Sequence, residues 1–262
     1  MILIISTLII VCLILTLQFS IFIPGPKGLP ILMYHKVSDD WNDNLTISVK
    51  NLEKQFNYLS SHGYTCLPLG RLLEKDQNLQ TGKVFALTFD DGYVNNLNYL
   101  YPLLEKYNFH CTIMLPVGFL GKTNVWDKGN EPIMNFDQLL SMDSRFVSYG
   151  LHSYRHESLL TMSSEEIITD IKTCINELNL NGIAYLPIIA YPYGAYPRDK
   201  VNKAFFAKIL EQLGILYGFR IGNRVNKWPM KNCYEVKRID IKGTDSFWAF
   251  KTKLRKGRVK MF

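Results

Sequence analysis

The sequence predicts an α/β protein built as a distorted (β/α) barrel with a parallel-strand core, preceded by one transmembrane helix. Two observations lead to this prediction. Apolar, strand-like runs alternate with amphipathic helical segments along most of the 262 residues, a pattern typical of parallel strands with helices outside. Residues 1–23 contain no charged side chain. The roughly 235 residues that remain are about enough for a single α/β barrel.

The N-terminal segment is the first expected element. Because about 20 apolar residues span a bilayer as a helix, we expect residues 1–23 to be an uncleaved membrane anchor. A cleavable signal peptide is the alternative, but the segment has no basic start and no small-residue cleavage site before Pro24. Residues 24–30, rich in Pro and Gly, form the expected linker. Only Lys27 flanks the segment closely, so charge does not determine its orientation.

Strands and helices then alternate along the chain. Apolar runs predict strands at residues 29–34, 83–89, 110–115, 145–149, 186–191, 217–220 and 234–239. Helical spacing predicts helices from Ser48 to before Gly63, over residues 97–107 and 136–142, from Ser163 through residue 178, and over residues 200–213. Ser163 and Glu166 match a capping box, and Gly214 is placed to end the last of these helices.

Polar residues with catalytic potential share one position in this pattern. Each follows the C-terminal end of an expected strand: His35, Asp90, Asp91, His152 and Tyr193. In (β/α) barrels, catalytic groups gather on that rim. An open doubly wound sheet would also place them on one edge, although less convergently.

Two histidines and two aspartates indicate a metal site. His152 and His156 are four residues apart, so a helical turn would aim both at one point. With Asp91 they make a two-histidine, one-carboxylate set, which leaves positions open as in catalytic metal sites. Asp90 points elsewhere and is free to accept a proton from a water that the cation activates. The alternative is a surface Asp-Asp-Gly turn, which the apolar run before it disfavours.

These motifs resemble those of the polysaccharide deacetylase family, also called carbohydrate esterase family four. The matching runs are Thr-Phe-Asp-Asp-Gly at 88–92, His-Ser-Tyr-Arg-His at 152–156 and Pro-Tyr-Gly at 192–194. The resemblance covers roughly residues 30–240. It implies a barrel that removes N-acetyl groups from amino sugars with a divalent metal, zinc first and cobalt, nickel or manganese as alternatives.

The resemblance also implies a role for each residue of these motifs. Asp90 would be the general base, and Tyr193 would donate its backbone N–H to the oxyanion. The metal ligands would be Asp91, His152 and His156.

Two positions depart from the family pattern. Ala190 stands where an arginine usually braces the base, and no histidine follows residue 156 to act as general acid. His35 ends a Leu-Met-Tyr-His run similar to the early motif of the poly-N-acetylglucosamine deacetylase branch, which implies His35 as the acid. A structural histidine is the alternative. Arg238 and Asp240 are candidates to brace the site, and an ordinary ion pair explains them equally well.

The net charge of +7 is concentrated at the C terminus. The last twelve residues hold six basic side chains and no acidic one: Lys251, Lys253, Arg255, Lys256, Arg258 and Lys260. With neighbouring aromatic residues, residues 246–262 predict a basic amphipathic tail suited to an anionic membrane surface, or else a solvated tail. No recognition motif accompanies the charge, so nucleic acid is not an expected partner. Residues 31–245 form the expected catalytic domain.

The expected protein is a single-pass deacetylase of the cell membrane. The resemblance favours a catalytic domain outside the cytoplasm that acts on an N-acetylated cell-surface polysaccharide or on a lipid-linked amino sugar. A catalytically weak or inactive glycan-binding barrel is the alternative. Cysteine spacing shows no C-x-x-C pair, and Cys66, Cys111 and Cys174 are expected to be core thiols.

Overall fold

The computed structural model describes residues 25–259 of the chain, except for residues 40, 75–82, 128 and 228. The predicted anchor at residues 1–23 lies outside the described residues. In the part that is described, none of the helices has both the length and the apolar character needed to cross a membrane.

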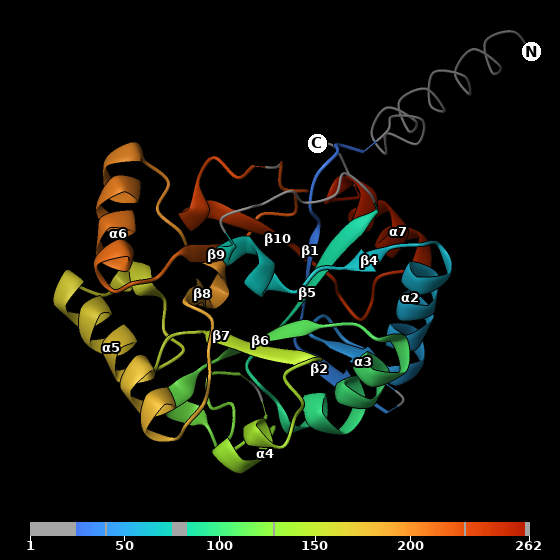
Figure 1. Ribbon diagram of the computed structural model, residues 1–262, viewed down its shortest axis with the longest axis horizontal. Helices are drawn as coiled ribbons and strands as arrows, with labels where there is room; N and C mark the ends of the chain where they lie inside the picture. The colour runs from blue at the N-terminus through green and yellow to red at the C-terminus, as the bar shows by residue number, and fades with distance from the viewer. Residues whose placement is uncertain (1–24, 40, 75–82, 128, 228, 260–262) are drawn as a thin grey trace, which may run out of the picture.

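Parallel strands form a closed ring (Figure 1). The ring follows the order β1, β10, β9, β8, β7, β6, β5, and it closes because β1 pairs with both β10 and β5. Its strands are β1 (Ile31–Tyr34), β5 (Val84–Asp90), β6 (Cys111–Leu115), β7 (Val147–Leu151), β8 (Ile188–Ala190), β9 (Tyr217–Ile221) and β10 (Val236–Asp240). The prediction of a parallel (β/α) barrel is therefore confirmed.

The ring is irregular, and three short strands lie beside it. β7 and β8 share a single residue pair, Leu151 with Ile189, which makes this the weakest joint of the barrel. β4 (Thr65–Cys66) pairs with the start of β5. β2 (Lys36–Ser38) pairs in parallel with β3 (Thr46–Ser48) in a separate two-stranded sheet. The expected distortion is thus present.

Helices surround the ring (Figure 1). They are α2 (Val49–Ser61), α3 (Tyr101–Tyr107), α4 (Phe136–Leu140), α5 (Ser164–Leu180), α6 (Lys200–Gln212) and α7 (Phe247–Lys256). A π-helical turn, η2 (Asn96–Leu100), precedes α3. Short 3₁₀ turns lie at Leu69–Leu73, Val117–Phe119, Leu159–Thr161, Pro192–Gly194 and Cys233–Glu235. Ser48 caps α2, and the Ser163–Glu166 capping box begins α5 as predicted.

One apolar cluster fills the inside of the barrel. Its members come from six strands and include Ile31, Ala86 and Val236. Because side chains alternate along a strand, Asp90 shares the inner face of β5 with Ala86, and Arg238 shares the inner face of β10 with Val236. Asp90 and Arg238 therefore lie inside the barrel, next to the apolar cluster that fills it.

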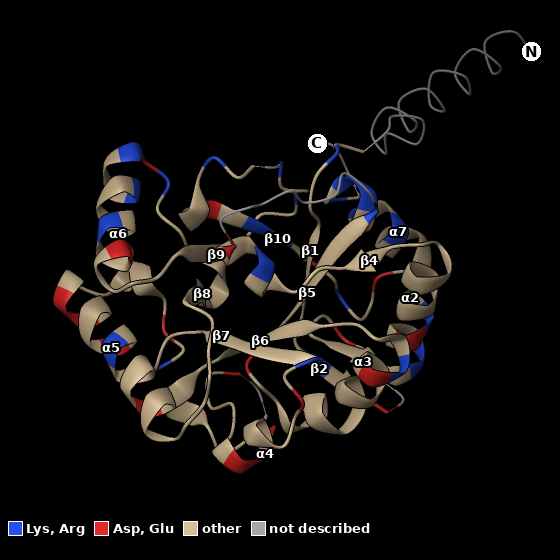
Figure 2. Cartoon of the chain, in the orientation of Figure 1, with Lys and Arg blue, Asp and Glu red and all other residues tan. Residues whose placement is uncertain are grey.

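The C-terminal basic segment is a helix of the domain rather than a separate tail. Phe250 and Leu254 of α7 are 0% and 2% exposed and belong to the core. Phe250 packs against Tyr58 of α2, with 6.3 Å between the ring centroids. The apolar positions between the lysines follow helical spacing and face the barrel, so α7 packs against the rest of the fold. Figure 2 shows basic positions, drawn in blue, along α7.

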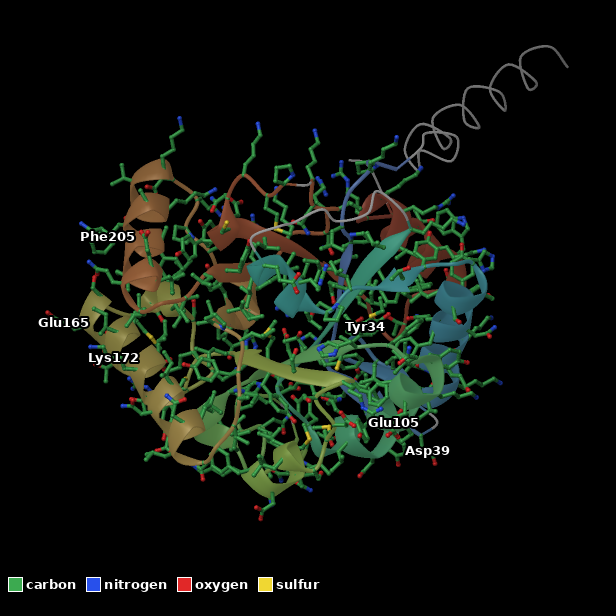
Figure 3. All side chains as sticks on the ribbon, in the orientation of Figure 1. Tyr34, Asp39, Glu105, Glu165, Lys172 and Phe205 are labelled. Carbon is green, nitrogen blue, oxygen red and sulfur yellow. The ribbon has the colours of Figure 1, made fainter. Side chains whose placement is uncertain are left out.

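Side chains separate by environment elsewhere as well. Figure 3 shows Glu165, Lys172 and Phe205 extending outward from the outer helices, whereas Tyr34 lies within the fold. Cys66, Cys111 and Cys174 are free thiols, and the last two are fully buried. Burial raises the pKa of the partly buried Cys66 to about 12. Their interpretation as core thiols agrees with these positions.

Candidate active site

Two adjacent aspartates end β5 and point in different directions. Asp90 is the last residue of the strand, and Asp91 takes a left-handed backbone with φ of 71°. The Asp91 amide still donates to the Met114 carbonyl at 3.0 Å, which anchors the turn to β6. Because the left-handed residue breaks the strand, the two carboxylates turn apart, as the sequence predicted.

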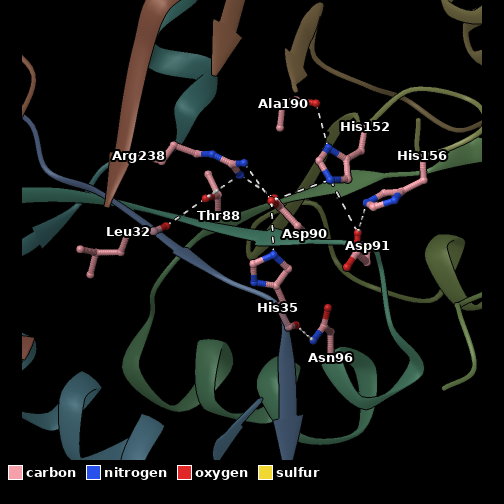
Figure 4. A network of polar contacts seen from close by, with 10 residues as sticks. All are labelled: Leu32, His35, Thr88, Asp90, Asp91, Asn96, His152, His156, Ala190 and Arg238. Atoms are coloured by element: carbon pink, nitrogen blue, oxygen red, sulfur yellow. Dashed lines mark hydrogen bonds and ion pairs between the residues drawn. The ribbon is translucent and has the colours of Figure 1, made fainter. Parts of the chain in front are cut away.

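Arg238 forms a bidentate ion pair with Asp90 through both terminal nitrogens of its guanidinium (Figure 4). Nη1 donates to Asp90 Oδ1 at 2.5 Å, and Nη2 donates to Oδ2 at 2.8 Å. Nη1 also reaches Thr88 Oγ1 at 3.4 Å, whose hydroxyl donates to the Leu32 carbonyl at 2.9 Å. The arginine missing at Ala190 is therefore supplied from β10, which is separated from β5 by the single strand β1.

Asp240, the other residue suggested to support Asp90, makes its contacts elsewhere. Its backbone amide donates to Asn223 Oδ1 at 2.9 Å, and its carbonyl accepts from Lys253 Nζ at 2.8 Å. Its side chain is absent from the network of described residues around Asp90 (Figure 4). Of the two candidates, only Arg238 braces the site.

The ion pair keeps the Asp90 carboxyl ionised. Burial raises the pKa of Asp90, but the charge of Arg238 and its hydrogen bonds outweigh burial, so the pKa lies below its ordinary value. The side chains of Asp90 and Arg238 are only 3% and 1% exposed. In so dry a site, a carboxylate without its arginine would be strongly disfavoured.

The two histidines lie on an irregular loop after β7, not on a helical turn. The predicted turn is wrong because Ser153 and His156 have φ values of 61° and 53°, which no right-handed helix allows. Asp170 of α5 holds the loop by accepting the Tyr154 amide at 2.8 Å and the Arg155 amide at 3.3 Å. The loop thus brings both imidazoles to the same side by strained backbone rather than by helical periodicity.

Asp91, His152 and His156 converge as a metal-binding set. Their ligand atoms all lie within 4.8 Å of one another, and all three side chains are buried. Asp91 Oδ1 is 3.6 Å from His152 Nε2 and 3.2 Å from His156 Nε2. Asp91 Oδ1 has no hydrogen-bond partner among the described residues, although it is buried. A divalent cation at this point would satisfy it, so the residues fit such an ion.

Neighbouring groups orient both imidazoles. His152 Nδ1 donates to the Ala190 carbonyl at 2.8 Å, which leaves Nε2 free to face Asp91. The ring of Trp126 stacks on His156, with 4.0 Å between centroids and 21° between planes. Position 190 therefore contributes its carbonyl, and Trp126 is a site residue that sequence reasoning missed, because stacking leaves no motif.

The pKa shifts of His152 and Asp91 favour the protonation states that bind a cation. Burial lowers the pKa of His152 to about 4, so its imidazole is neutral at neutral pH. Burial raises the pKa of Asp91, but His156, whose Nε2 lies 3.2 Å from Asp91 Oδ1, outweighs burial and holds the pKa well below its ordinary value. Neutral imidazoles and an ionised carboxylate are the forms that bind metals.

His35 and Tyr193 complete the rim. His35 follows β1, and its Nε2 lies 3.9 Å from Asp90 Oδ2, while its carbonyl accepts from Asn96 Nδ2 at 2.9 Å. Tyr193 lies in the turn after β8 with φ of 59°, and its ring contacts His156 edge-on at 5.1 Å. The structure therefore places all six residues predicted for the site around one point.

This fold and site define a class of hydrolase, and comparison with known proteins places the chain within it. The sequence model described as "Polysaccharide deacetylase" matches residues 77–215. The chain belongs to the polysaccharide deacetylase family, as its motifs predicted.

Individual relatives share low sequence identity with this chain. YxkH of Bacillus subtilis is 27% identical over 182 residues, which are 68% of this chain and 61% of that protein. The chain thus spans about three fifths of that relative. The poly-beta-1,6-N-acetyl-D-glucosamine N-deacetylase of Staphylococcus epidermidis is 24% identical over 237 residues, covering 82% of this chain and 79% of that enzyme.

Solved structures share the fold. The deacetylase PplD of Streptococcus pyogenes, in complex with acetate, superposes with a TM-score of 0.72 at 23% identity and covers 88% of this chain and 100% of its own. IcaB of Ammonifex degensii gives a TM-score of 0.70 at 19% identity, covering 88% of this chain and 97% of its own. At these identities the likeness establishes the barrel alone.

Proposed function

We propose that the protein is a metal-dependent carbohydrate N-deacetylase that hydrolyses N-acetyl groups of a poly-N-acetylglucosamine. The observation that carries this proposal is the pairing of two functions at one point. Asp91, His152 and His156 form a cation site, and Asp90, held ionised by Arg238, lies beside it. Family membership supports the reaction, and the names of the staphylococcal relatives support the sugar.

The donor set favours zinc. Two imidazole nitrogens and one carboxylate oxygen leave room for water and substrate, which is the usual arrangement of catalytic zinc. Cobalt, nickel or manganese would suit the same ligands. When bound, the cation would polarise the acetamide carbonyl and make a water easier to deprotonate.

The chain's own residues then divide the proton transfers. Asp90 accepts the proton of the attacking water, and Arg238 keeps that carboxylate ionised and fixed. The Tyr193 backbone N–H donates to the oxyanion that forms as water adds to the carbonyl carbon. His35, whose Nε2 lies 3.9 Å from Asp90 Oδ2, protonates the leaving nitrogen. The C–N bond breaks, releasing acetate and a free amine.

The alternative function, an inactive glycan-binding barrel, no longer has the argument that supported it. That alternative rested on Ala190 in place of the bracing arginine, and Arg238 fulfils this role from another strand. The proposal is tested by measuring acetate release from N-acetylglucosamine oligomers by the metal-stripped chain, with and without added zinc. We expect release only with metal, and none from Asp90→Asn. Zinc-independent release, or equal release from the variant, would contradict the proposal.

We also propose that the protein works at the outer face of the cell membrane. The apolar sequence of residues 1–23 ends just before Gly25, whose backbone packs so tightly on α7 that a Cβ would lie 1.9 Å from the Arg255 carbonyl oxygen. The domain therefore begins next to the basic end of α7. A basic surface beside an apolar anchor suits anionic lipid headgroups. A lipid-linked amino sugar is the alternative substrate that this placement would favour.

Vesicle binding tests the basic surface. Deleting the C-terminal residues would remove Leu254 from the core, so neutralisation is the sharper change. In a chain that begins at residue 25, we expect Lys251→Gln with Arg255→Gln to weaken binding to anionic vesicles. The control variant, Lys172→Gln with Lys208→Gln on outer helices, should bind as wild type. Equal binding by all three proteins would refute this location of the surface.

A further inference from the structure

The two histidines of the metal set differ in what holds their second ring nitrogen. His152 Nδ1 donates to the Ala190 carbonyl at 2.8 Å. His156 Nδ1 is buried, and it has no hydrogen-bond partner among the described residues. Metal-binding histidines almost always donate this N–H to an oxygen, which fixes the tautomer and the orientation of the ring. The orientation of His156 must therefore come from another kind of contact.

Aromatic rings supply that contact. The indole of Trp126 lies flat on the His156 imidazole, with 4.0 Å between centroids and 21° between planes. Tyr193 meets the imidazole edge-on at 5.1 Å, and Phe119 meets the indole edge-on at 4.8 Å. Because the indole covers one face of the imidazole, turning the imidazole about its Cβ–Cγ bond would drive it into the indole. Trp126 therefore restrains the same rotation that a hydrogen bond at Nδ1 would restrain.

Trp126 lies on a loop, residues 122–133, that is paired with the chain directly after Asp91. An antiparallel bridge joins Tyr93 to Ile133. Tyr93 follows Asp91 by two residues, so the bridge fixes the loop relative to the carboxylate ligand of the metal set. The loop therefore holds the indole at a fixed position beside the metal set.

Polar contacts anchor this loop on both sides of the indole. Before it in the chain, the buried Asn124 accepts the Glu131 amide at 2.8 Å through Oδ1 and donates to the Tyr93 hydroxyl at 3.3 Å through Nδ2. Directly after it, Asp127 pairs at 3.5 Å with Lys36, which is also buried. With both neighbouring positions anchored, the loop keeps the indole from swinging away from the imidazole.

The stacked indole favours the metal-bound form of His156 over the metal-free form. The imidazole gains positive charge when its Nε2 binds a cation. The face of an aromatic ring attracts positive charge, and among the aromatic side chains tryptophan does so most strongly. The stack of Trp126 on His156 is therefore stronger in the metal-bound protein, and this difference raises the affinity for the cation.

We propose that Trp126 is a positioning residue of the metal site, which takes the place of the hydrogen-bond acceptor that His156 Nδ1 lacks. Through the stack, Trp126 fixes the direction of His156 Nε2 and raises the affinity for the divalent cation. The inference rests on the metal site of the proposed function and is independent of the substrate. It makes the loop of residues 122–133 part of the metal centre.

Zinc affinity, measured in the full-length protein by competition with a chelating dye, tests this role. We expect Trp126→Leu to weaken zinc binding by about 10–100-fold, the range typical for loss of a group that orients a metal-binding histidine. Trp126→Phe keeps an aromatic face and should bind zinc nearly as tightly as wild type. The matched control is Trp248→Leu, since Trp248 is 46% exposed on α7. Wild-type affinity in Trp126→Leu, or equal losses in the leucine and phenylalanine variants, would overturn the proposal.

NMR of the metal-free protein with labelled histidine separates positioning from folding. The face of the indole should shift the ring protons of His156 upfield in wild type, and His156→Gln identifies these signals by their loss. Trp126→Leu should fold, since Trp126 is only partly buried, and should lose the upfield shift, whereas Trp126→Phe should keep part of it. Ordinary chemical shifts for His156 in wild type, or unchanged shifts in Trp126→Leu, would overturn the proposal.

Neither measurement requires turnover, so the inference and the proposed function fail separately. A wild-type protein that binds zinc but releases no acetate would overturn the proposed deacetylase, while weaker zinc binding by Trp126→Leu would still support the positioning role. Acetate release by wild type together with wild-type zinc affinity in Trp126→Leu would overturn the positioning role alone.

Discussion

Replacing Arg238 by methionine should expose the dependence of the general base on a partner from another strand, β10. The pair is almost dry, with side chains 1% and 3% exposed, and two charge-assisted hydrogen bonds of 2.5 and 2.8 Å join them. Removing one partner of a buried pair is expected to lower the free energy of unfolding by about 3–5 kcal/mol. For a domain of this size that lowers the melting temperature by roughly 10 °C.

Catalysis should change in a way that stability alone does not explain. The pKa of Asp90 lies below its ordinary value because the charge and hydrogen bonds of Arg238 outweigh burial. Without Arg238, burial raises the pKa of Asp90, so a higher pH is needed to ionise the base. The acid limb of the profile of kcat/KM against pH should therefore move to higher pH. A base that has lost its orientation should also lower kcat roughly 10²-fold.

Acetate release between pH 4 and 9, with thermal denaturation in parallel, measures both effects. Arg238→Lys keeps the charge but not the two-pronged geometry, and it should fall between wild type and Arg238→Met. Arg220→Met on β9 is the matched control, since Arg220 makes one hydrogen bond of 2.9 Å to Glu235 and is 32% exposed. An Arg238→Met enzyme with the acid limb of wild type would refute the reasoning.

Four further results are expected. Asp91→Ala should reduce bound zinc to near zero by elemental mass spectrometry, because it removes the carboxylate ligand. His35→Gln should lower kcat by roughly 10²–10⁴-fold at unchanged zinc content, as expected for a general acid. Asp170→Ala, which releases the histidine loop, should weaken zinc affinity by about tenfold or more while the zinc-saturated enzyme remains active. The metal-free protein should lose stability as pH falls from about 6.5 to about 4. In that window the unfolded chain binds a proton that His152, with its pKa lowered by burial to about 4, does not bind when folded.

Each of these has a contrary outcome. Full zinc content in Asp91→Ala would remove that residue from the ligand set. Full activity of His35→Gln would mean that His35 has a structural role and is not the general acid. Unchanged zinc affinity in Asp170→Ala would mean that the loop holds its shape unaided. A melting temperature that is constant between pH 6.5 and 4 would mean that His152 is protonated in the fold.

Local signals predicted most of the framework. Apolar alternation located the ring strands, and the capping residues Ser48 and Ser163 marked the starts of α2 and α5. Such signals succeed because they depend on neighbours within a few residues. The six predicted site residues also converge, since strand ends of a parallel barrel share one rim.

Local reasoning failed where the backbone is strained or the contact is remote. A spacing of four residues indicated a helical turn for His152 and His156, but left-handed residues at Ser153 and His156 shape the loop instead. The basic C-terminal segment looked like a tail, because its charges conceal the burial of Phe250 and Leu254. The strained loop does not follow from composition or periodicity, and the helical spacing of Phe250 and Leu254 does not by itself show what they pack against.

The sequence by itself determined the alternation of strands and helices, the acids and imidazoles that follow the strands, and through them the family. Only the tertiary structure decided that Arg238 holds Asp90, a residue 148 positions earlier in the chain. That contact exists because β1 pairs with both β5 and β10 and so closes the ring. Closure depends on hydrogen bonds between strands far apart in sequence, and no local pattern encodes which remote side chain then faces the base.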